Sequence, residues 1–136
     1  MGLTIRAKGL LDEHSYDCGY ITFTNFRIAV AKAYNQEFGE LFQKNCYNWF
    51  EHKFTKDDLT RIIELANDDL DIFLEHSDYD GKMTPQECRK VYSVIKDLSV
   101  EMIGHNYGAM ENYNMLEQWK NIFKHCYTRR VNLYFL

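Results

Sequence analysis

The residues from His76 to Glu87 carry oxygen-bearing side chains at the spacing of an EF-hand calcium loop. Such a loop has twelve residues, with oxygen ligands at positions 1, 3, 5, 7, 9 and 12 and a glycine at position 6. Gly81 fits position 6. The side-chain ligand positions 3, 5, 9 and 12 then fall on Asp78, Asp80, Thr84 and Glu87. The spacing therefore predicts a calcium site.

The first position of this loop departs from the pattern, because His76 stands where an aspartate usually anchors the ion. An imidazole is a poor ligand for a hard cation. Two interpretations follow: a weak Ca²⁺ site, or a turn without an ion in which Glu87 and Thr84 form a helix capping box. Both stay open, and no other cofactor is predicted.

A fainter copy of the same pattern lies at residues 14–25, where His14, Gly19 and Thr22 match His76, Gly81 and Thr84 at a constant offset. This copy has no acid at positions 3, 5 or 12. If it is a repeat, it binds no metal; a chance similarity is the alternative.

A second candidate site lies at the C-terminal end, where residues 118–136 hold four bases and no acid. Lysine and arginine neutralise phosphates, and tyrosine rings stack on bases. The predicted ligand-binding residues are Tyr107, Tyr113, Lys124, Tyr127, Arg129 and Arg130. A small anionic, nucleotide-like ligand fits this set, whereas the net charge of −4 disfavours duplex DNA. The alternative is that these tyrosines pack at the edge of the core.

No catalytic constellation is recognisable, so no catalytic residue is predicted. His76 lies close in sequence to Glu75 and Asp78, which allows a small hydrolase as an alternative. A histidine at the end of a helix more often interacts with the helix dipole or forms a turn.

The run His-Ser-Asp-x-Asp-Gly followed by Thr-Pro-x-Glu-Cys, at residues 76–88, resembles an element of small bacteriophage and bacterial proteins. The Asp-Cys-Gly-Tyr run at 17–20 and the Val-Asn-Leu-Tyr-Phe run at 131–135 also resemble that group. The resemblance implies a phage or prophage setting and does not imply an activity. By analogy with small phage proteins that block host defence, it suggests a function in binding.

Five helical patterns must position these residues. Apolar residues recur with a period of 3.6. The patterns cover about residues 24–33, 38–49, 55–74, 84–102 and 109–128. Thr22 or Thr24, Thr55 and Thr84 are the expected N-caps. Trp49, Leu59 and Ile63 are expected on buried stripes, and the glycines at 104 and 108 mark a break.

Period-two alternation at residues 3–7 and 131–136 predicts two strands, which we expect to pair with each other. The predicted fold class is therefore mainly α (α+β). It has about five helices, an EF-hand-like helix-loop-helix and a small β-ribbon formed by the two ends of the chain. A single domain spanning residues 1–136 is expected from this length.

The composition is that of a globular protein, with 46% hydrophobic and 15% aromatic residues. Apolar runs are far shorter than the roughly 20 residues of a membrane-spanning helix, so a protein without a membrane partner and located in the cytoplasm is expected. Cys18, Cys46, Cys88 and Cys126 form no metal or redox motif and are expected to be reduced.

These observations predict a non-enzymatic binding protein, encoded by a phage or prophage, that acts in the host cytoplasm. It would sequester a ligand of host defence, either a nucleotide signal or a host protein. The alternatives are a cation-binding EF-hand-like interaction module and the hydrolase built on His76. A homo-oligomer is compatible with each of these functions.

Overall fold

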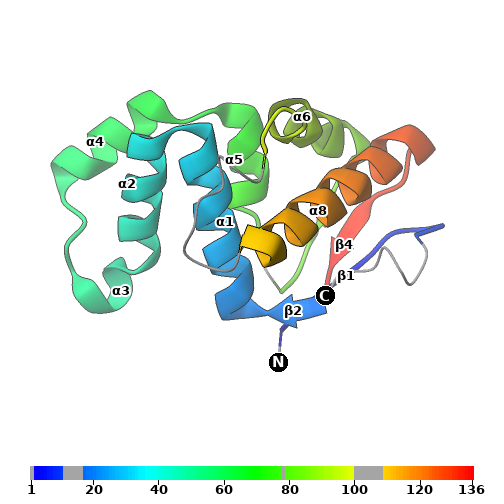
Figure 1. Ribbon diagram of the computed structural model, residues 1–136, viewed down its shortest axis with the longest axis horizontal. Helices are drawn as coiled ribbons and strands as arrows, with labels where there is room; N and C mark the ends of the chain where they lie inside the picture. Colours follow the sequence, from blue (N-terminus) through cyan, green and yellow to red (C-terminus); the bar gives the residue numbers. More distant parts are fainter. Residues whose placement is uncertain (1, 11–16, 78, 100–108) are drawn as a thin grey trace.

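The computed structural model describes residues 2–10, 17–77, 79–99 and 109–136, without the side chains of residues 2, 17, 18 and 109–113. This part of the chain forms seven helices and one small antiparallel sheet (Figure 1). The predicted class, mainly helical with a small β component, is confirmed.

The helices account for most of the described chain. Their bounds are α1 (Tyr20–Tyr34), α2 (Gln36–Cys46), α3 (Asn48–Glu51), α4 (Lys56–Leu65), α5 (Asp68–Leu74), α6 (Pro85–Ile95) and α8 (Ala109–Arg129). Helices α1 and α2 form an antiparallel pair, and α8 runs alongside α6 (Figure 1). Helix α5, the loop at 75–84 and α6 form the predicted helix-loop-helix.

Two of the predicted helices are each divided in two. The pattern at 38–49 breaks at Tyr47 into α2 and α3, and Trp49 is 76% exposed instead of lying on a buried stripe. The pattern at 55–74 breaks between α4 and α5. There the Asn67 side chain accepts a hydrogen bond from the amide of Leu70 and starts a new helix. An asparagine that caps a helix competes with the continuation of the preceding one, which the apolar period alone does not show.

The first predicted helix and the fourth also differ at their ends. Helix α1 starts at Tyr20, before Thr22 and Thr24, and its N-cap Gly19 makes no side-chain capping bond. Helix α6 ends at Ile95. Residues 96–99 are described and are not helical, so the predicted continuation to residue 102 is wrong over that stretch. Residues 100–102 and the predicted break at 104–108 lie outside the described residues.

The other two predicted caps are confirmed, and both are reciprocal capping boxes. Thr55 accepts from the amide of Asp58, whose carboxylate accepts from the amide of Thr55. Thr84 and Glu87 repeat this arrangement at 3.2 and 2.9 Å. In each box the side chains satisfy backbone amides that have no partner within the helix.

The sheet joins the two ends of the chain, as predicted. Its order is β2 (Asp17–Gly19), β1 (Gly2–Arg6), β4 (Leu133–Phe135) and β3 (Lys82–Met83). Ile5 pairs with Phe135, and Met83 pairs with Leu133, in antiparallel register. The loop from His76 to Glu87 is therefore attached through β3 to the C-terminal strand.

Trp119 of α8 lies at the centre of an aromatic core. It is fully buried, and its ring centroid lies 5.0 to 5.5 Å from those of Phe23, Phe73 and Phe123. Phe135 of β4 stacks on the same indole at 6.2 Å. The helices and the sheet therefore share one core, and the high aromatic content is largely used there.

The cysteines whose side chains are described are free thiols. Cys88 of α6 and Cys126 of α8 are buried, whereas Cys46 is only partly buried. The thiol of Cys88 donates a hydrogen bond to Cys126, and this bond, together with burial, raises the pKa of Cys88 above its usual value. These two thiols therefore act as packing groups between α6 and α8.

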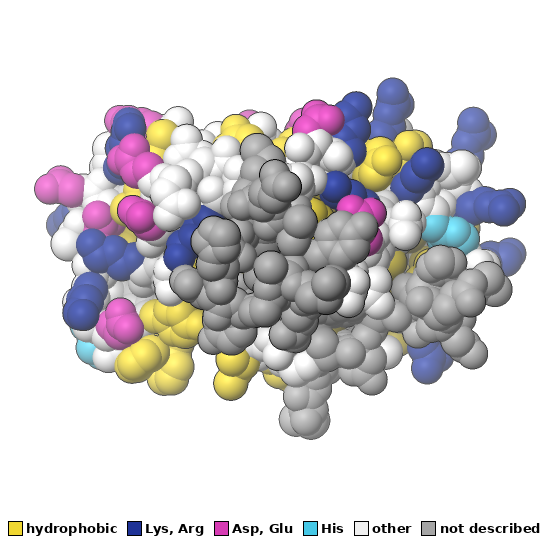
Figure 2. All heavy atoms as spheres, viewed as in Figure 1, with side chains coloured by type: hydrophobic (Ala, Val, Ile, Leu, Met, Phe, Trp, Pro, Cys, Tyr) yellow, Lys and Arg dark blue, Asp and Glu magenta, His cyan; other side chains and the backbone are white. Residues whose placement is uncertain are grey.

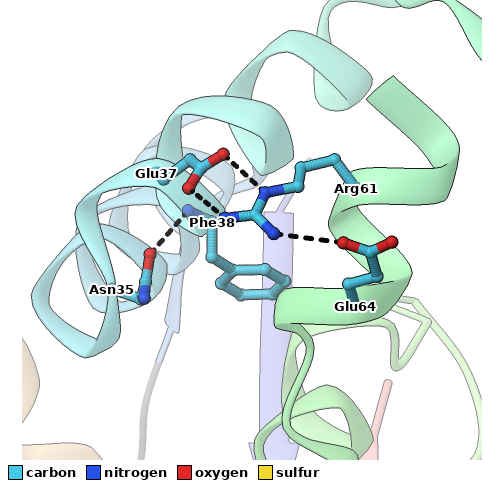
Figure 3. A network of polar contacts seen from close by, with 5 residues as sticks. All are labelled: Asn35, Glu37, Phe38, Arg61 and Glu64. Carbon is cyan, nitrogen blue, oxygen red and sulfur yellow. Dashed lines mark hydrogen bonds and ion pairs between the residues drawn. The ribbon is translucent and has the colours of Figure 1, made fainter. Parts of the chain in front are cut away.

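Helix α4 is attached to α2 by charged side chains. The guanidinium of Arg61 lies 2.8 Å from both carboxylate oxygens of Glu37 and 3.1 Å from Glu64 (Figure 3). Lys44 of α2 forms an ion pair with Asp58 of α4 at 2.8 Å.

In the described residues, no helix combines the length and the hydropathy needed to cross a membrane.

Candidate ligand-binding site

The loop at 76–87 has the sharp turn that its glycine predicts. Gly81 has a φ of +87°, a left-handed conformation that glycine adopts at little cost. Its carbonyl accepts a hydrogen bond from the amide of Phe135 at 3.0 Å. Met83, two residues on, is fully buried. The loop is therefore fixed to the core by backbone pairing and by one apolar side chain.

His76 takes part in the same attachment. Its ring stacks on Phe135 with the centroids 4.0 Å apart. Its Nδ1 lies 2.7 Å from the carbonyl oxygen of Ser77, and its Nε2 lies 3.1 Å from that of Lys82. Both ring nitrogens are thus used in contacts within the loop. The hydrolase built on His76 stays a prediction that no contact in the described residues supports.

The four predicted metal ligands do not come together as a described cluster. Asp78 lies outside the described residues, and Asp80 is exposed. Thr84 and Glu87 are engaged in the capping box of α6. Within the described part of the chain, no three His, Cys, Asp or Glu side chains are close enough to hold an ion. The weak calcium site stays a prediction, and the capping box accounts for two of its four residues without an ion.

The faint copy of the loop at residues 14–25 adopts a different structure where it is described. Ile21, which corresponds to the buried Met83, lies in α1 and is 77% exposed. Residues 14–16 are outside the described part. The two segments therefore share a sequence pattern but differ in backbone conformation at residues 20–21, which are helical where the corresponding residues 82–83 form a strand.

The predicted basic ligand-binding residues are separated into two pockets. One, the Arg130 pocket, has a volume of about 500 Å³ and is lined by Thr84, Pro85, Gln86, Arg89, Tyr127 and Arg130. The other, the Arg129 pocket, has a volume of about 340 Å³ and is lined by Leu10, Asn121, Lys124, His125, Thr128 and Arg129. The two adjacent arginines thus contribute to different surfaces.

The backbone at Arg130 explains this separation. Arg130 has a φ of +57°, and the amide of Val131 donates to the carbonyl of Cys126 at 3.1 Å. This is the Schellman ending of a helix, in which the left-handed residue is usually glycine. A non-glycine residue in this conformation costs roughly 1 kcal/mol. Arg130 holds its side chain over the pocket at that cost.

The Arg130 pocket combines groups that suit an anion with an aromatic ring. The guanidinium groups of Arg89 and Arg130 are exposed, and neither forms an ion pair with an acid of the described chain. The N-terminal end of α6 lines the same pocket through Thr84, Pro85 and Gln86. Its capping box already pairs the amides of Thr84 and Glu87, so the charge available to an anion comes from the two arginines. The ring of Tyr127 lies beside them, tilted against Tyr92 at 5.5 Å.

The Arg129 pocket is basic too, but it is closed on one side by the N-terminal segment. The Nε2 of His125 lies 3.0 Å from the carbonyl oxygen of Lys8. Figure 2 shows Lys and Arg side chains gathered at the right-hand end of the molecule, where Figure 1 places the C-terminal part of α8. Both basic pockets therefore belong to the positive end of the protein.

Two predicted ligand-binding tyrosines cannot be placed in either pocket. Tyr107 and the side chain of Tyr113 lie outside the described residues.

Arg89 lines the Arg130 pocket but was not predicted from the sequence. It lies one turn after Pro85, on the side of α6 opposite to the buried Val91. That helical position was readable, but its proximity to Arg130 depends on how α6 and α8 pack.

We compared the chain with protein-family models, with curated protein sequences and with solved structures, and no match was found in any of the three.

Proposed function

We propose that this protein is a non-enzymatic binding protein that sequesters a small anionic, nucleotide-like ligand in the Arg130 pocket. The observation that carries the proposal is the pairing of Arg89 with Arg130, whose side chain is held over the pocket by a strained backbone. Strain of this kind is common at functional sites. A glycine would serve the helix ending better than Arg130 does.

The chemistry of the pocket supports this class of ligand. Two guanidinium groups can bind a phosphate through several charged hydrogen bonds at once. The ring of Tyr127 offers a flat face for a base. The volume of about 500 Å³ lies within the range of small-molecule sites, and it is too small for a duplex.

The sequence resemblance supplies the setting of the proposal. A phage or prophage protein with such a pocket would act in the host cytoplasm and remove a nucleotide signal of host defence. Sequestration requires only affinity, so no catalytic residue is invoked. A homo-oligomer that places two copies of the pocket together is compatible with this function.

The first test is native mass spectrometry of the protein as purified from cells, followed by its denatured mass. The expected result is an excess of several hundred daltons, typical of a nucleotide, that is lost on denaturation. The sample is then titrated by calorimetry with AMP, cyclic AMP and cyclic di-AMP. A bare native mass together with no heat from any of the three nucleotides contradicts the proposal.

Variants of the two arginines make the test specific to one pocket. Arg130→Gly is expected to raise the free energy of unfolding by roughly 1 kcal/mol, because glycine relieves the left-handed residue. The same variant, and Arg89→Gln, should weaken nucleotide binding at least tenfold by removing a charged hydrogen bond. Arg129→Gln is the matched control and should leave binding nearly unchanged. If Arg129→Gln and Arg130→Gly weakened nucleotide binding equally, the binding would depend on the overall positive charge and not on the Arg130 pocket.

A further inference from the structure

The apolar face of helix α4 is only partly covered: Ile62 and Leu65 pack against the core, whereas the apolar side chains beside them point outward. None of its side chains is buried, although apolar residues recur along it with helical spacing. Leu59 and Ile63, four residues apart on that face, are 51% and 67% exposed. Residues four apart lie on the same side of a helix. Together they form an apolar ridge that faces solvent.

A pocket of about 340 Å³ lies against this ridge, between α1, α2, α4 and α5. We call the pocket and the ridge together the α4 groove. Its apolar lining includes Phe38 and Phe42 of α2 and Leu59, Ile62 and Ile63 of α4. Phe38 points from α2 toward α4 beneath the Arg61 ion pairs (Figure 3). The apolar surface thus extends from inside the pocket to the exposed ridge.

The charged groups of the α4 groove are not balanced. Asp71 and Glu75 of the α5 segment line it, and neither carboxylate forms an ion pair or hydrogen bond with another described residue. Burial and the nearby Glu75 raise the pKa of Asp71 to about 6. Arg27, the one base among the lining residues, donates to the carbonyl of His76 at 2.7 Å and lies over the ring of Phe23.

We propose that the α4 groove docks an amphipathic, basic helix of a partner protein. Apolar side chains of that helix would insert beside Leu59 and Ile63, and a Lys or Arg would face Asp71 and Glu75. Recognition of this kind uses anchors spaced three, four and seven residues apart. The negative wall disfavours a nucleotide. This site is therefore independent of the Arg130 pocket and stands whether or not that pocket binds its ligand.

The test uses a defined peptide and the full-length protein. A fluorescein-labelled helical peptide of about fourteen residues, with Leu on one face and Lys on the other, is titrated by fluorescence anisotropy. A second peptide replaces every Lys by Glu. We expect the Lys peptide to bind and the Glu peptide to bind at least tenfold more weakly, because the acidic side chains oppose it.

Two pairs of variants connect this binding to the α4 groove. Ile63→Ser should weaken binding of the Lys peptide about tenfold, because an apolar side chain of the peptide loses its contact with Ile63. Ile21→Ser removes an equally exposed apolar side chain from α1 and should have no effect. Glu75→Gln should weaken binding about threefold. Asp97→Asn, which changes the net charge equally at an exposed site after α6, should not.

Three results would overturn the proposal. One is equal affinity for the Lys and Glu peptides. Another is an equal loss for Ile63→Ser and Ile21→Ser while both variants keep the wild-type circular dichroism spectrum. The third is a concentration-dependent dimer, measured by light scattering, that Ile63→Ser abolishes, because a second copy of the chain would then occupy the α4 groove.

Discussion

The left-handed backbone conformation of Arg130 places the side chains of Arg129 and Arg130 in different pockets. Arg129 is the last residue of α8 and lines one pocket, whereas Arg130 turns the chain and lines the other. The sequence shows two adjacent bases but not this turn, because arginine has no preference for a positive φ. The structure therefore divides the predicted cluster between two pockets, with Lys124 and Arg129 in one and Arg130 in the other.

The carboxyl group of Asp71 should make the stability of the protein depend on pH in a measurable way. Its folded-state pKa is raised from 3.8 to about 6 by burial, then by Glu75 and Asp68. A raised pKa contributes stability that is present below the unfolded value and is lost as the pH rises through the folded value. The wild-type protein should therefore lose stability from this group between about pH 4 and pH 6.

The variant Asp71→Asn cannot ionise and should not show this loss. At pH 7 we expect it to be more stable than wild type by less than about 1 kcal/mol, because Asp71 is only partly buried and solvent screens its charge. Urea unfolding at about pH 4.5 and at pH 7 measures the difference. If the free energies of unfolding of the two proteins differed by the same amount at both pH values, Asp71 would not titrate in this range.

Two of the three helix N-caps expected from the sequence are confirmed. Thr55 and Thr84 have an acid three residues later, and both form the expected capping box. The breaks at Tyr47 and Asn67 were missed because apolar residues keep the helical period across them. Asn67 caps α5, so the asparagine at that break was the overlooked signal, whereas Tyr47 makes no side-chain capping bond and gave none.

The two capping boxes should differ in their effect on stability. Thr84→Ala should lower the free energy of unfolding by about 1 kcal/mol, because α6 buries Cys88, Val91 and Ile95 in the core. Thr55→Ala removes the same bonds from α4, which buries no side chain. We expect it to increase hydrogen exchange locally in 56–65 with a smaller global effect. Equal losses in urea unfolding for the two variants would contradict this.

At the scale of the molecule, strand β4 connects parts that are far apart in sequence. It pairs with β1 on one side and with β3 on the other, so it links the first residues to the loop at 76–87. Its pairing with β1 was predicted from alternation at the two ends. Its pairing with β3 was not, because a two-residue strand leaves no periodic signal.

Truncation of alternate residues of β4 should have very different effects on the stability of the protein. Phe135 is 1% exposed and contacts both Trp119 and His76, so Phe135→Ala should cost about 3–5 kcal/mol. Tyr134 is 44% exposed on the other face, and Tyr134→Ala should cost less than about 0.5 kcal/mol. Denaturant unfolding measures both variants. Similar costs would mean that β4 does not present Phe135 to the core.

The pairing of Ile5 with Phe135 also sets an order of events during translation. Ribosomes add about 5–20 residues per second, so β1 leaves the ribosome roughly ten seconds before its partner exists. During that interval β1 has only β2 to pair with among the described strands. The apolar side chains of Leu3 and Ile5 therefore lack this neighbour until β4 has been synthesised and has joined the sheet.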